Sequence, residues 1–340
     1  MFDMLRPYHP EVPKDPRTLL KTPRTCSNKV LSNGNYVHLG IERALLYEVN
    51  RRQTTEIPEM RIQLHIDGTR LFKGSGQCLW PIIARISHPV IGEPFVVGVF
   101  SGFGKPEPVD EFLHDCVCEL KGLLGGGLRL PSTGDIVKVE LANIICDAPA
   151  RSYIRQVKAH NGYYGCDRCC HVGIPIANRM RFPPYSGPPR DDMSLRLRKQ
   201  AMHHRGISPL EELPIDMVAC FPMDYMHLVC LGVMRKLLHM WRLGVKKFSA
   251  ALNARIKKCS NCLPTEFARK CRTLDCLEYW KAAEFRQFLL YIGPAALNSF
   301  LDQERYQHFL KLSVAVYIFS HLRLHITCID FARIWSTFTK

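Results

Sequence analysis

Apolar and polar residues alternate strictly over residues 60–67. One face of this stretch carries the apolar side chains of Met60, Ile62, Leu64 and Ile66. The alternation predicts a half-buried β-strand that ends at Asp67, with Gly68 as the turn residue that follows. Two further apolar stretches, 77–86 and 94–100, lie between Gly- and Pro-containing turns and predict two more strands.

The pattern then changes to a helical period. Pro108 and the acidic residues Asp110 and Glu111 are helix-start signals. Apolar residues recur every three or four positions from there to the glycines at 125–127, which end the helix. Residues 136–146 predict another strand, with Asp147 directly after it. The expected order is therefore strand, strand, strand, helix, strand.

The flanking segments follow other patterns. Residues 1–57 are rich in turns and contain one amphipathic stretch, 41–49. Helical spacing of apolar residues returns over 217–245 and 280–318. We expect an N-terminal extension at 1–57, an α/β core at 58–160, and a basic, mostly helical insertion at 161–340.

The strand order and the two aspartates together indicate a partial ribonuclease H-like core. In such a core the first two catalytic carboxylates lie at the ends of adjacent central strands, where they can share divalent metal ions. Asp67 and Asp147 are 80 residues apart in the sequence, so a fold of this kind is needed to bring them together. The alternative is that both are ordinary turn residues, and strand order alone leaves this open.

The charge of the chain points to a partner. Its 46 Lys and Arg against 31 Asp and Glu give a formal net charge of +15, which favours a polyanion such as DNA. Between Arg151 and Arg205 there are eleven Lys or Arg and three Asp, so +8 of this charge lies in 55 residues. Aromatic residues are interleaved there, a mixture that suits phosphates and exposed bases. The candidate nucleic-acid contacts are Arg151, Arg155, Lys158, Arg168, Arg179 and Arg181. The alternative is a solvated basic face on an inserted segment.

The chain has 15 cysteines, an odd number, and its first residues lack the apolar stretch of a secretory signal. We therefore expect a reducing compartment with free or metal-bound thiols. Cys166 and Cys169 form a Cys-x2-Cys knuckle, which can present two thiolates to one Zn²⁺. Asp224 and His227 are the candidates to complete this site. The rival candidates are Cys170, His160 and His171.

Two weaker features are interpreted as structural. Cys259, Cys262, Cys271 and Cys276 have a spacing that could close a four-thiolate site, but scattered free thiols are the simpler interpretation. The pair His203 and His204 is expected to form a surface turn.

Several kinds of chemistry have no support in the sequence. It contains no Gly-x4-Gly-Lys-Ser/Thr phosphate loop, no Gly-x-Ser-x-Gly elbow and no His-Glu-x2-His pair. No uncharged apolar run approaches the ~18 residues of a membrane-spanning helix, so we expect no membrane association.

Five segments together resemble a known family. They are HPEVPKDPRTLLKTP (9–23), HIDGTRLFKGSGQCLWPII (65–83), CDAPARSYIRQVKAHNGYYGCDRC (146–169), FPMDYMHLVCLGVMRKLL (221–238) and WKAAEFRQFLLYIGP (280–294). The chain resembles the transposase-like proteins that DNA transposons encode in animal genomes, related to the CACTA (En/Spm) group. The resemblance covers roughly residues 9 to 320.

This resemblance implies a DDE-type recombinase that cleaves and joins DNA with Mg²⁺ or Mn²⁺. The first two metal-binding carboxylates of the family correspond to Asp67 and Asp147. Its Cys-x2-Cys and Asp-x2-His motifs correspond to Cys166 and Cys169, and to Asp224 and His227.

The third acid of the family is a glutamate in a Phe-Glu-Asn-like segment, and this sequence has no such segment. Glu284 and Glu304 are the available substitutes, although both come earlier than the expected position. We therefore expect a truncated transposase relic that is inactive or nearly so. The alternatives are a domesticated, non-catalytic nucleic-acid- or protein-binding module and, more remotely, a zinc-dependent regulator. A nuclear location follows from these functions, and the sequence leaves open whether the chain forms a homo-oligomer.

Overall fold

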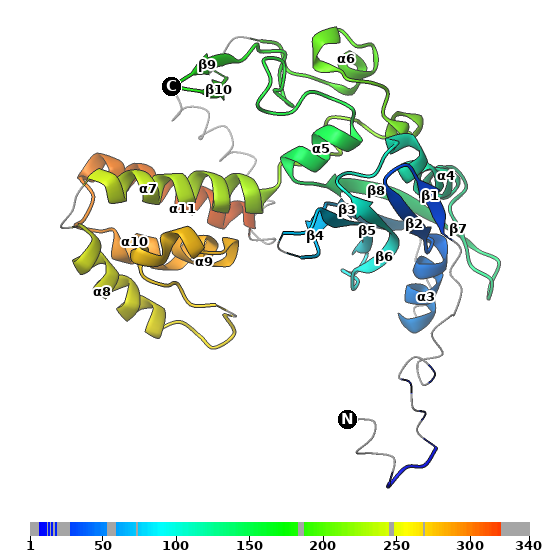
Figure 1. Cartoon of the computed structure of the whole chain (residues 1–340), viewed down its shortest axis with the longest axis horizontal. Helices are drawn as coiled ribbons and strands as arrows, with labels where there is room; N and C mark the ends of the chain where they lie inside the picture. Colours follow the sequence, from blue (N-terminus) through cyan, green and yellow to red (C-terminus); the bar gives the residue numbers. More distant parts are fainter. Residues whose placement is uncertain are drawn as a thin grey trace. The chain divides into compact units, whose positions relative to one another are not determined.

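The computed structural model describes residues 28–52, 59–72, 74–182, 187–244, 248–267 and 269–320, with a few positions between 7 and 18 (Figure 1). The chain divides into two compact units, Met1–Met223 and Asp224–Lys340. Each unit has its own hydrophobic core. The sequence suggested boundaries after residues 57 and 160. The division falls at 223 because the segments before 57 and after 160 both contribute side chains, such as Tyr36 and Phe221, to the first core.

The first unit is built on one mixed β-sheet of eight described strands. These are β1 (Lys29–Leu31), β2 (Gly34–His38), β3 (Glu59–Ile66), β4 (Thr69–Arg70), β5 (Gln77–His88), β6 (Phe95–Phe103), β7 (Leu128–Arg129) and β8 (Ile136–Ile145). Their order across the sheet is β1-β2-β6-β5-β3-β8-β7, and β4 pairs with β5. β3 and β8 are parallel, whereas the other neighbouring strands are antiparallel.

The expected α/β class is confirmed, and the predicted order of the three strands, the helix and the fourth strand is present as β3, β5, β6, α4 (Val109–Gly126) and β8. The hairpin β1–β2 was not predicted. Its strands are too short to show an alternating pattern in the sequence. The hairpin is placed in the sheet by the pairing of β2 with β6. The amphipathic stretch 41–49 corresponds, apart from Ile41, to the first part of α3 (Glu42–Arg52).

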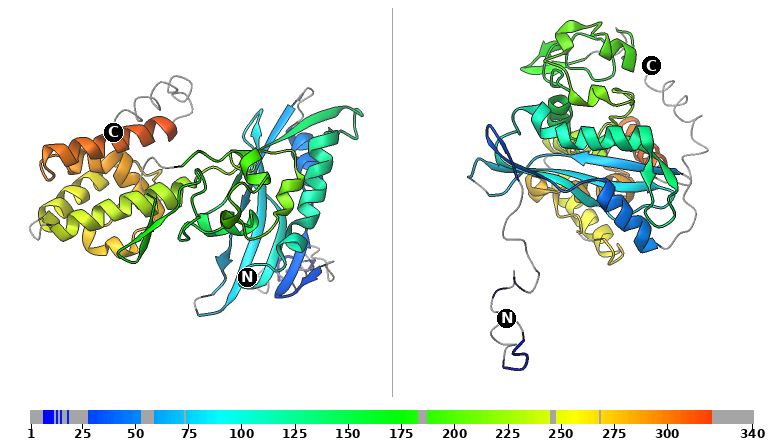
Figure 2. Two further views of the ribbon diagram at one scale, coloured as in Figure 1. Left: turned by 90° about the horizontal axis from the view of Figure 1, so that it is seen from above. Right: turned by 90° about the vertical axis from the view of Figure 1, so that its right-hand side faces the viewer.

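Helix α4 packs along one face of the sheet (Figure 2). Its buried residues are Phe112, Leu113, Cys116, Val117, Leu120 and Leu123, which recur at helical spacing. The ring of Phe112 makes edge contacts with Tyr36 of β2 and Phe100 of β6. Along β3 the alternating residues predicted to be apolar are all buried, which explains why the alternation located this strand well.

The remainder of the first unit consists of short elements. These are α5 (Ala148–Ile154), β9 (Ile174–Ile176), β10 (Arg179–Arg181), α6 (Asp192–Arg196) and the 3₁₀ turns η1 (Ala201–His203) and η2 (Pro209–Glu212). The sequence predicted an exposed, Pro-rich loop over 174–192. Its first part is instead the antiparallel hairpin β9–β10, and residues 183–186 lie outside the described residues.

The second unit is helical over its described residues. Its elements are the π-helix η3 (Met226–Met234), α7 (Arg235–Gly244), α8 (Phe248–Asn261), the 3₁₀ helix η4 (Leu274–Tyr279), α9 (Ala282–Gln287), the π-helix η5 (Phe288–Ile292), α10 (Gly293–Ala296) and α11 (Gln303–Ser320). Its core centres on aromatic side chains that include Trp280, Phe285 and Phe288. The helical pattern over 280–318 and most of that over 217–245 thus predicted the class of this unit. Residues 217–223 are not helical and belong to the first unit, where Met217 and Phe221 are part of the core. Residues 321–340, in which the sequence shows no third acidic motif, lie outside the described residues.

Candidate functional site

The two aspartates singled out from the sequence lie at the same edge of the sheet. β3 and β8 are adjacent and parallel, and their last paired residues are His65 and Ile145. Asp67 and Asp147 each follow two positions later. Because parallel strands end at the same edge, this register brings the two carboxylates side by side. This register is compatible with a shared metal site and also with two turn residues at one edge of the sheet.

A close contact fixes the chain directly after Asp67. A Cβ atom on Gly68 would come within 2.5 Å of the Trp80 ring, so only glycine fits at this point. The indole Nε1 of Trp80 donates to the Gly104 carbonyl at 3.0 Å, which ties the ends of β5 and β6 together. Asp67 itself accepts a hydrogen bond from the Gly68 amide at 2.7 Å. The Asp67 backbone is therefore held by packing rather than left in an open loop.

Asp147 is held as the N-cap of α5. Its Oδ1 accepts from the Ala150 amide at 2.6 Å. This contact satisfies one amide at the start of the helix and places a negative charge at its positive end. The residue before it, Cys146, has a pKa far above its ordinary value, chiefly because the thiol is buried, and the charges of Asp67 and Asp147 both add to the rise. Both carboxylates are thus within electrostatic reach of one thiol.

A cation that the sequence did not single out, Lys105, lies near Asp147. Lys105 follows β6, and its ammonium donates to the Pro149 carbonyl at 3.1 Å and lies 5.1 Å from the Tyr153 ring centroid. Burial lowers the pKa of Lys105, the charge of Asp147 opposes that change, and the charge of Arg205 adds to it. Lys105 is therefore near both Asp147 and the exposed Arg205. The only signal for Lys105 in the sequence was its place at the end of a predicted strand, which is too weak to identify it.

The thiols of Cys166 and Cys169 lie close together, as their spacing predicts. The two Sγ atoms are 3.2 Å apart. The guanidinium of Arg190 donates from Nε to the Cys166 carbonyl at 3.0 Å, and Cys166, Cys169 and Cys170 all affect the pKa of Arg190, which burial lowers. The knuckle can thus supply two thiolates to a soft metal such as Zn²⁺.

The proposed partners of this knuckle fall in the second unit. Asp224 lies just before the π-helix η3, and His227 is the second residue of that helix. The Asp224 carboxylate accepts hydrogen bonds from the Met226 amide at 2.9 Å and from the His227 ring. Among the described residues, no three His, Cys, Asp or Glu side chains gather into a group that could hold a metal. The four-residue zinc site therefore stays a prediction.

The six candidate DNA contacts are of two kinds. Arg151 and Arg155 are only 4% and 1% exposed, and both guanidinium groups pair with Asp167, which lies inside the knuckle. Arg168 donates to the Val218 and Phe221 carbonyls. These placements favour a structural role for the three arginines. Lys158 is half-buried, and Arg179 and Arg181 are exposed on β10.

The structure also shows the surroundings of three residues for which the sequence made weaker predictions: Glu284, Cys271 and His203. Glu284 is 1% exposed and its carboxylate accepts from Arg272 and from the Lys281 amide, so it is fully engaged within the second unit. The thiol of buried Cys271 donates to the Glu284 carbonyl at 3.1 Å, which fits a structural role. The interpretation of His203 as part of a surface turn is wrong. Its ring is fully buried, its Nδ1–H donates to the Tyr164 carbonyl, and burial lowers its pKa to about 4.

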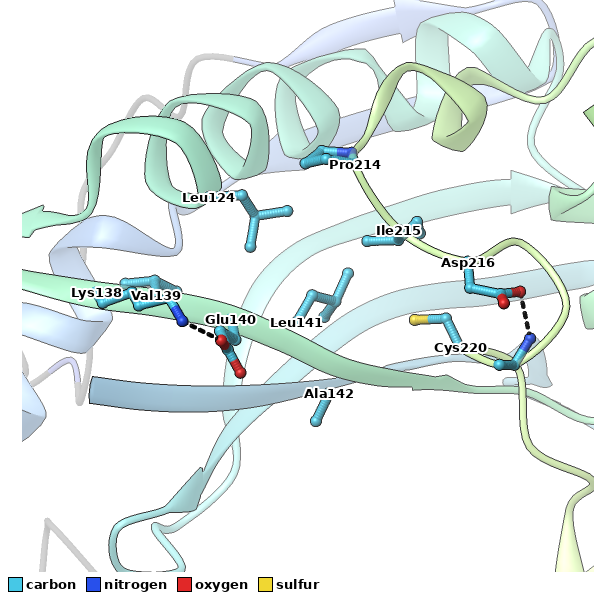
Figure 3. A pocket seen from close by; sticks show the side chains of 11 residues that line it. Leu124, Lys138, Val139, Glu140, Leu141, Ala142, Pro214, Ile215, Asp216 and Cys220 are labelled. Atoms are coloured by element: carbon cyan, nitrogen blue, oxygen red, sulfur yellow. Dashed lines mark hydrogen bonds and ion pairs between the residues drawn. The ribbon is translucent and has the colours of Figure 1, made fainter. Parts of the chain in front are cut away.

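A cleft of about 480 Å³ lies elsewhere in the first unit, along the outer edge of β8 (Figure 3). Leu124 of α4, the middle of β8 and the loop 214–220 form its walls. Lys138 and Glu140 pair with each other at one end, and Asp216 accepts from backbone amides at the other. Neither Asp67 nor Asp147 lines it, so it is separate from the carboxylate edge.

Comparison with models of known protein families gives no match, and no curated protein matches the sequence. Within the described part of the chain, every helix is too short or too polar to cross a lipid bilayer. The functional argument therefore rests on the geometry of the site.

Proposed function

We propose that this chain is a transposase-derived protein with a ribonuclease H-like core, in which Asp67 and Asp147 form a two-carboxylate metal site of the DDE type. The observation that carries the proposal is their matched position, two residues past the last paired residues of adjacent parallel strands. Carboxylates in this arrangement can share a hard divalent cation such as Mg²⁺.

The strand order supports the same proposal. Taking β3 as the first strand of such a core, β5 is the second, β6 the third and β8 the fourth. Their order in the sheet is third, second, first, fourth, with the first and fourth parallel and α4 connecting the third to the fourth. The first four strands of a ribonuclease H-like core have this order and these directions, which supports the proposal.

The donor set fits Mg²⁺ or Mn²⁺. Two aspartate carboxylates are oxygen ligands, which these ions prefer, and neither sulfur nor imidazole is needed. The bound metal would stabilise negative charge on a phosphodiester and lower the pKa of an attacking hydroxyl. The protein's own contribution is positional: Trp80 and Gly68 fix the Asp67 backbone, and α5 fixes Asp147 through its N-cap. Lys105 and Arg205 would attract and orient the phosphate backbone beside the two acids.

The proposal assigns two carboxylates to the metal site, those of Asp67 and Asp147. The two glutamates considered as a third ligand are not assigned to it: Glu284 forms an ion pair with Arg272, and Glu304 is an exposed residue of α11 in the second unit. Three carboxylates are what this class of enzyme uses to position its metals, so two should bind metal weakly. We accordingly expect weak metal binding and no efficient strand transfer.

Manganese binding tests the proposal directly. Free Mn²⁺ is measured by its electron paramagnetic resonance signal during titration of the wild-type chain, Asp67→Asn and Asp147→Asn. We expect each variant to weaken Mn²⁺ binding by about tenfold or more, because the remaining carboxylate is a single ligand. Asp135→Asn, an exposed aspartate in the loop between β7 and β8, is the matched control. Equal Mn²⁺ affinity in wild type and both site variants would refute the metal site.

A second function, a non-catalytic DNA-binding module, is favoured by a separate observation. Arg179 and Arg181 are exposed, and they belong to β10, a different element from the strands that precede Asp67 and Asp147. A binder of this kind would keep its salt-dependent DNA affinity when Asp67 and Asp147 are both changed to alanine. Loss of DNA affinity in that double variant would tie binding to the metal site instead. Either function has DNA as its partner, and we propose a nuclear location on that ground.

A further inference from the structure

The hairpin β9–β10 has one anchored face and one open face. In its register Ile174 pairs with Arg181, Pro175 with Met180, and Ile176 with Arg179. Side chains of directly paired residues share a face, and successive pairs alternate. Ile174, Ile176, Arg179 and Arg181 therefore lie together on one face, and Pro175 and Met180 on the other.

The face that carries Met180 anchors the hairpin. Met180 and Phe182 pack so closely over Gly173 that an added Cβ there would meet both. The Phe182 ring makes an edge contact with His171, 6.5 Å between centroids, and His171 is 8% exposed. His171 comes two residues after Cys169, so the hairpin is attached to the cysteine knuckle.

The opposite face is exposed along its length. Ile174 and Ile176 are 48% and 44% exposed, and Arg179 and Arg181 are also exposed. Each exposed isoleucine leaves apolar surface in water beside a guanidinium group. Such a face is complementary to a surface that is anionic and also offers apolar contacts.

The turn gives the hairpin a narrow tip. Ala177 and Asn178 have φ values of 50° and 59°, the backbone of a tight two-residue hairpin turn. A two-stranded ribbon is narrow enough for the major groove of duplex DNA, where arginines reach phosphates or guanine edges and apolar side chains meet thymine methyl groups. In Figure 1 the hairpin lies at the periphery of the first unit, away from its sheet.

We propose that the Ile174–Ile176–Arg179–Arg181 face of β9–β10 enters a groove of duplex DNA. This inference rests on the proposed function, in which DNA is the partner, and adds the form of the nucleic acid and the element that reads it. The charge of the region, +8 between Arg151 and Arg205, supports an anionic occupant. Arg151, Arg155 and Arg168 are engaged inside the unit, whereas Arg179 and Arg181 are exposed on the hairpin.

The experiment measures fluorescence anisotropy of the full chain with a random-sequence duplex and with one of its strands, over a range of salt concentrations. We expect wild type to prefer the duplex. Arg179→Ala/Arg181→Ala should weaken duplex binding about tenfold or more and make the slope of log affinity against log salt shallower by about 1.8, for two phosphate contacts. Ile174→Thr/Ile176→Thr should weaken binding with the slope unchanged. Arg179→Lys/Arg181→Lys should retain most of the slope.

The matched control is Arg43→Ala/Arg129→Ala, which removes two exposed arginines from α3 and β7. It should bind as wild type does. If the chain binds duplex DNA and the hairpin variants bind it equally well, the hairpin inference is wrong and the proposed function stands. Preference for the single strand also overturns the inference. If wild type binds neither form of DNA, the proposed function fails as well.

Discussion

At the scale of single residues, the structure separates charges that act inside the fold from charges open to partners. Glu119 of α4 is an example of the first kind. The hydroxyl of Tyr36 donates to His38, whose Nε2–H donates to Glu119 at 2.9 Å. The same carboxylate accepts from the amides of Ile41 and Glu42 at the start of α3. One side chain thus connects β2, α3 and α4.

We predict that Glu119→Gln lowers the free energy of unfolding by about 1–3 kcal/mol at neutral pH. Burial raises the pKa of Glu119, but hydrogen bonds from His38 and from the Ile41 and Glu42 amides outweigh it, so the pKa is lowered overall. A lowered pKa means that the carboxylate stabilises the fold above its unfolded value of about 4.3, and that this stabilisation is lost as pH falls below it. Urea unfolding of both proteins between neutral and acid pH is the measurement.

The difference between wild type and Glu119→Gln should therefore shrink as the solution becomes more acid. Glu111→Gln, an exposed glutamate on the same helix, is the control and should change little at any pH. A difference that stays constant down to strongly acid pH would show that the Glu119 charge contributes nothing.

At the scale of elements, sequence pattern located those with a strong period. The strand at 60–67, the helix after Pro108 and the strand at 136–146 agree with β3, α4 and β8 within a few residues, because each buries one face. The hairpins β1–β2 and β9–β10 were missed, because three to five residues are too few to show a period. Asp67 and Asp147 could be predicted because each follows a well-marked strand.

Other parts of the site could not be predicted, because they depend on tertiary contacts. Nothing local to Lys105 shows that it approaches Asp147, and nothing local to Arg155 shows that Asp167 and the Phe221 ring enclose it. Charge density correctly marked the segment 151–205 as unusual. It could not tell which arginines would be buried in pairs and which would be exposed.

The β9–β10 turn leads to a prediction at the same scale. Ala177 has a φ of 50°, a backbone region that costs an L-residue with a Cβ atom roughly 1 kcal/mol. We predict that Ala177→Gly relieves this strain and slows amide hydrogen exchange in residues 174–181. Ala201→Gly, at an exposed alanine whose φ is not positive, is the control and should not slow exchange. Faster exchange in the hairpin of Ala177→Gly would contradict the assignment of a strained turn.

At the scale of the whole molecule, the chain contains two hydrophobic cores with no residue in common. The first is organised by the sheet and α4, and the second by helices around Trp280 and Phe288. Two separate cores are the basis for two cooperative units of unfolding.

We predict that Phe288→Ala destabilises the second unit by about 3–5 kcal/mol, because this ring is fully buried and its loss leaves a cavity. Hydrogen exchange followed by mass spectrometry should then show faster exchange in α9 and α11. Exchange in β3 and β8 should remain as in wild type. Phe112→Ala, the matching change in the first unit, should give the reverse pattern. Equal acceleration in both units after either change would mean that the two cores unfold as one.

The position of Asp167 has a consequence for how this protein can change over generations. It lies between the two knuckle cysteines, yet its carboxylate pairs with Arg151 and Arg155 at the far end of the helix that Asp147 caps. The thiol pair and the carboxylate pair are therefore supported by one short helix. Loss of Asp167 would leave two buried guanidinium groups without their counter-ion. Asp167 should therefore change little as the sequence diverges, whether or not the neighbouring cysteines hold a metal.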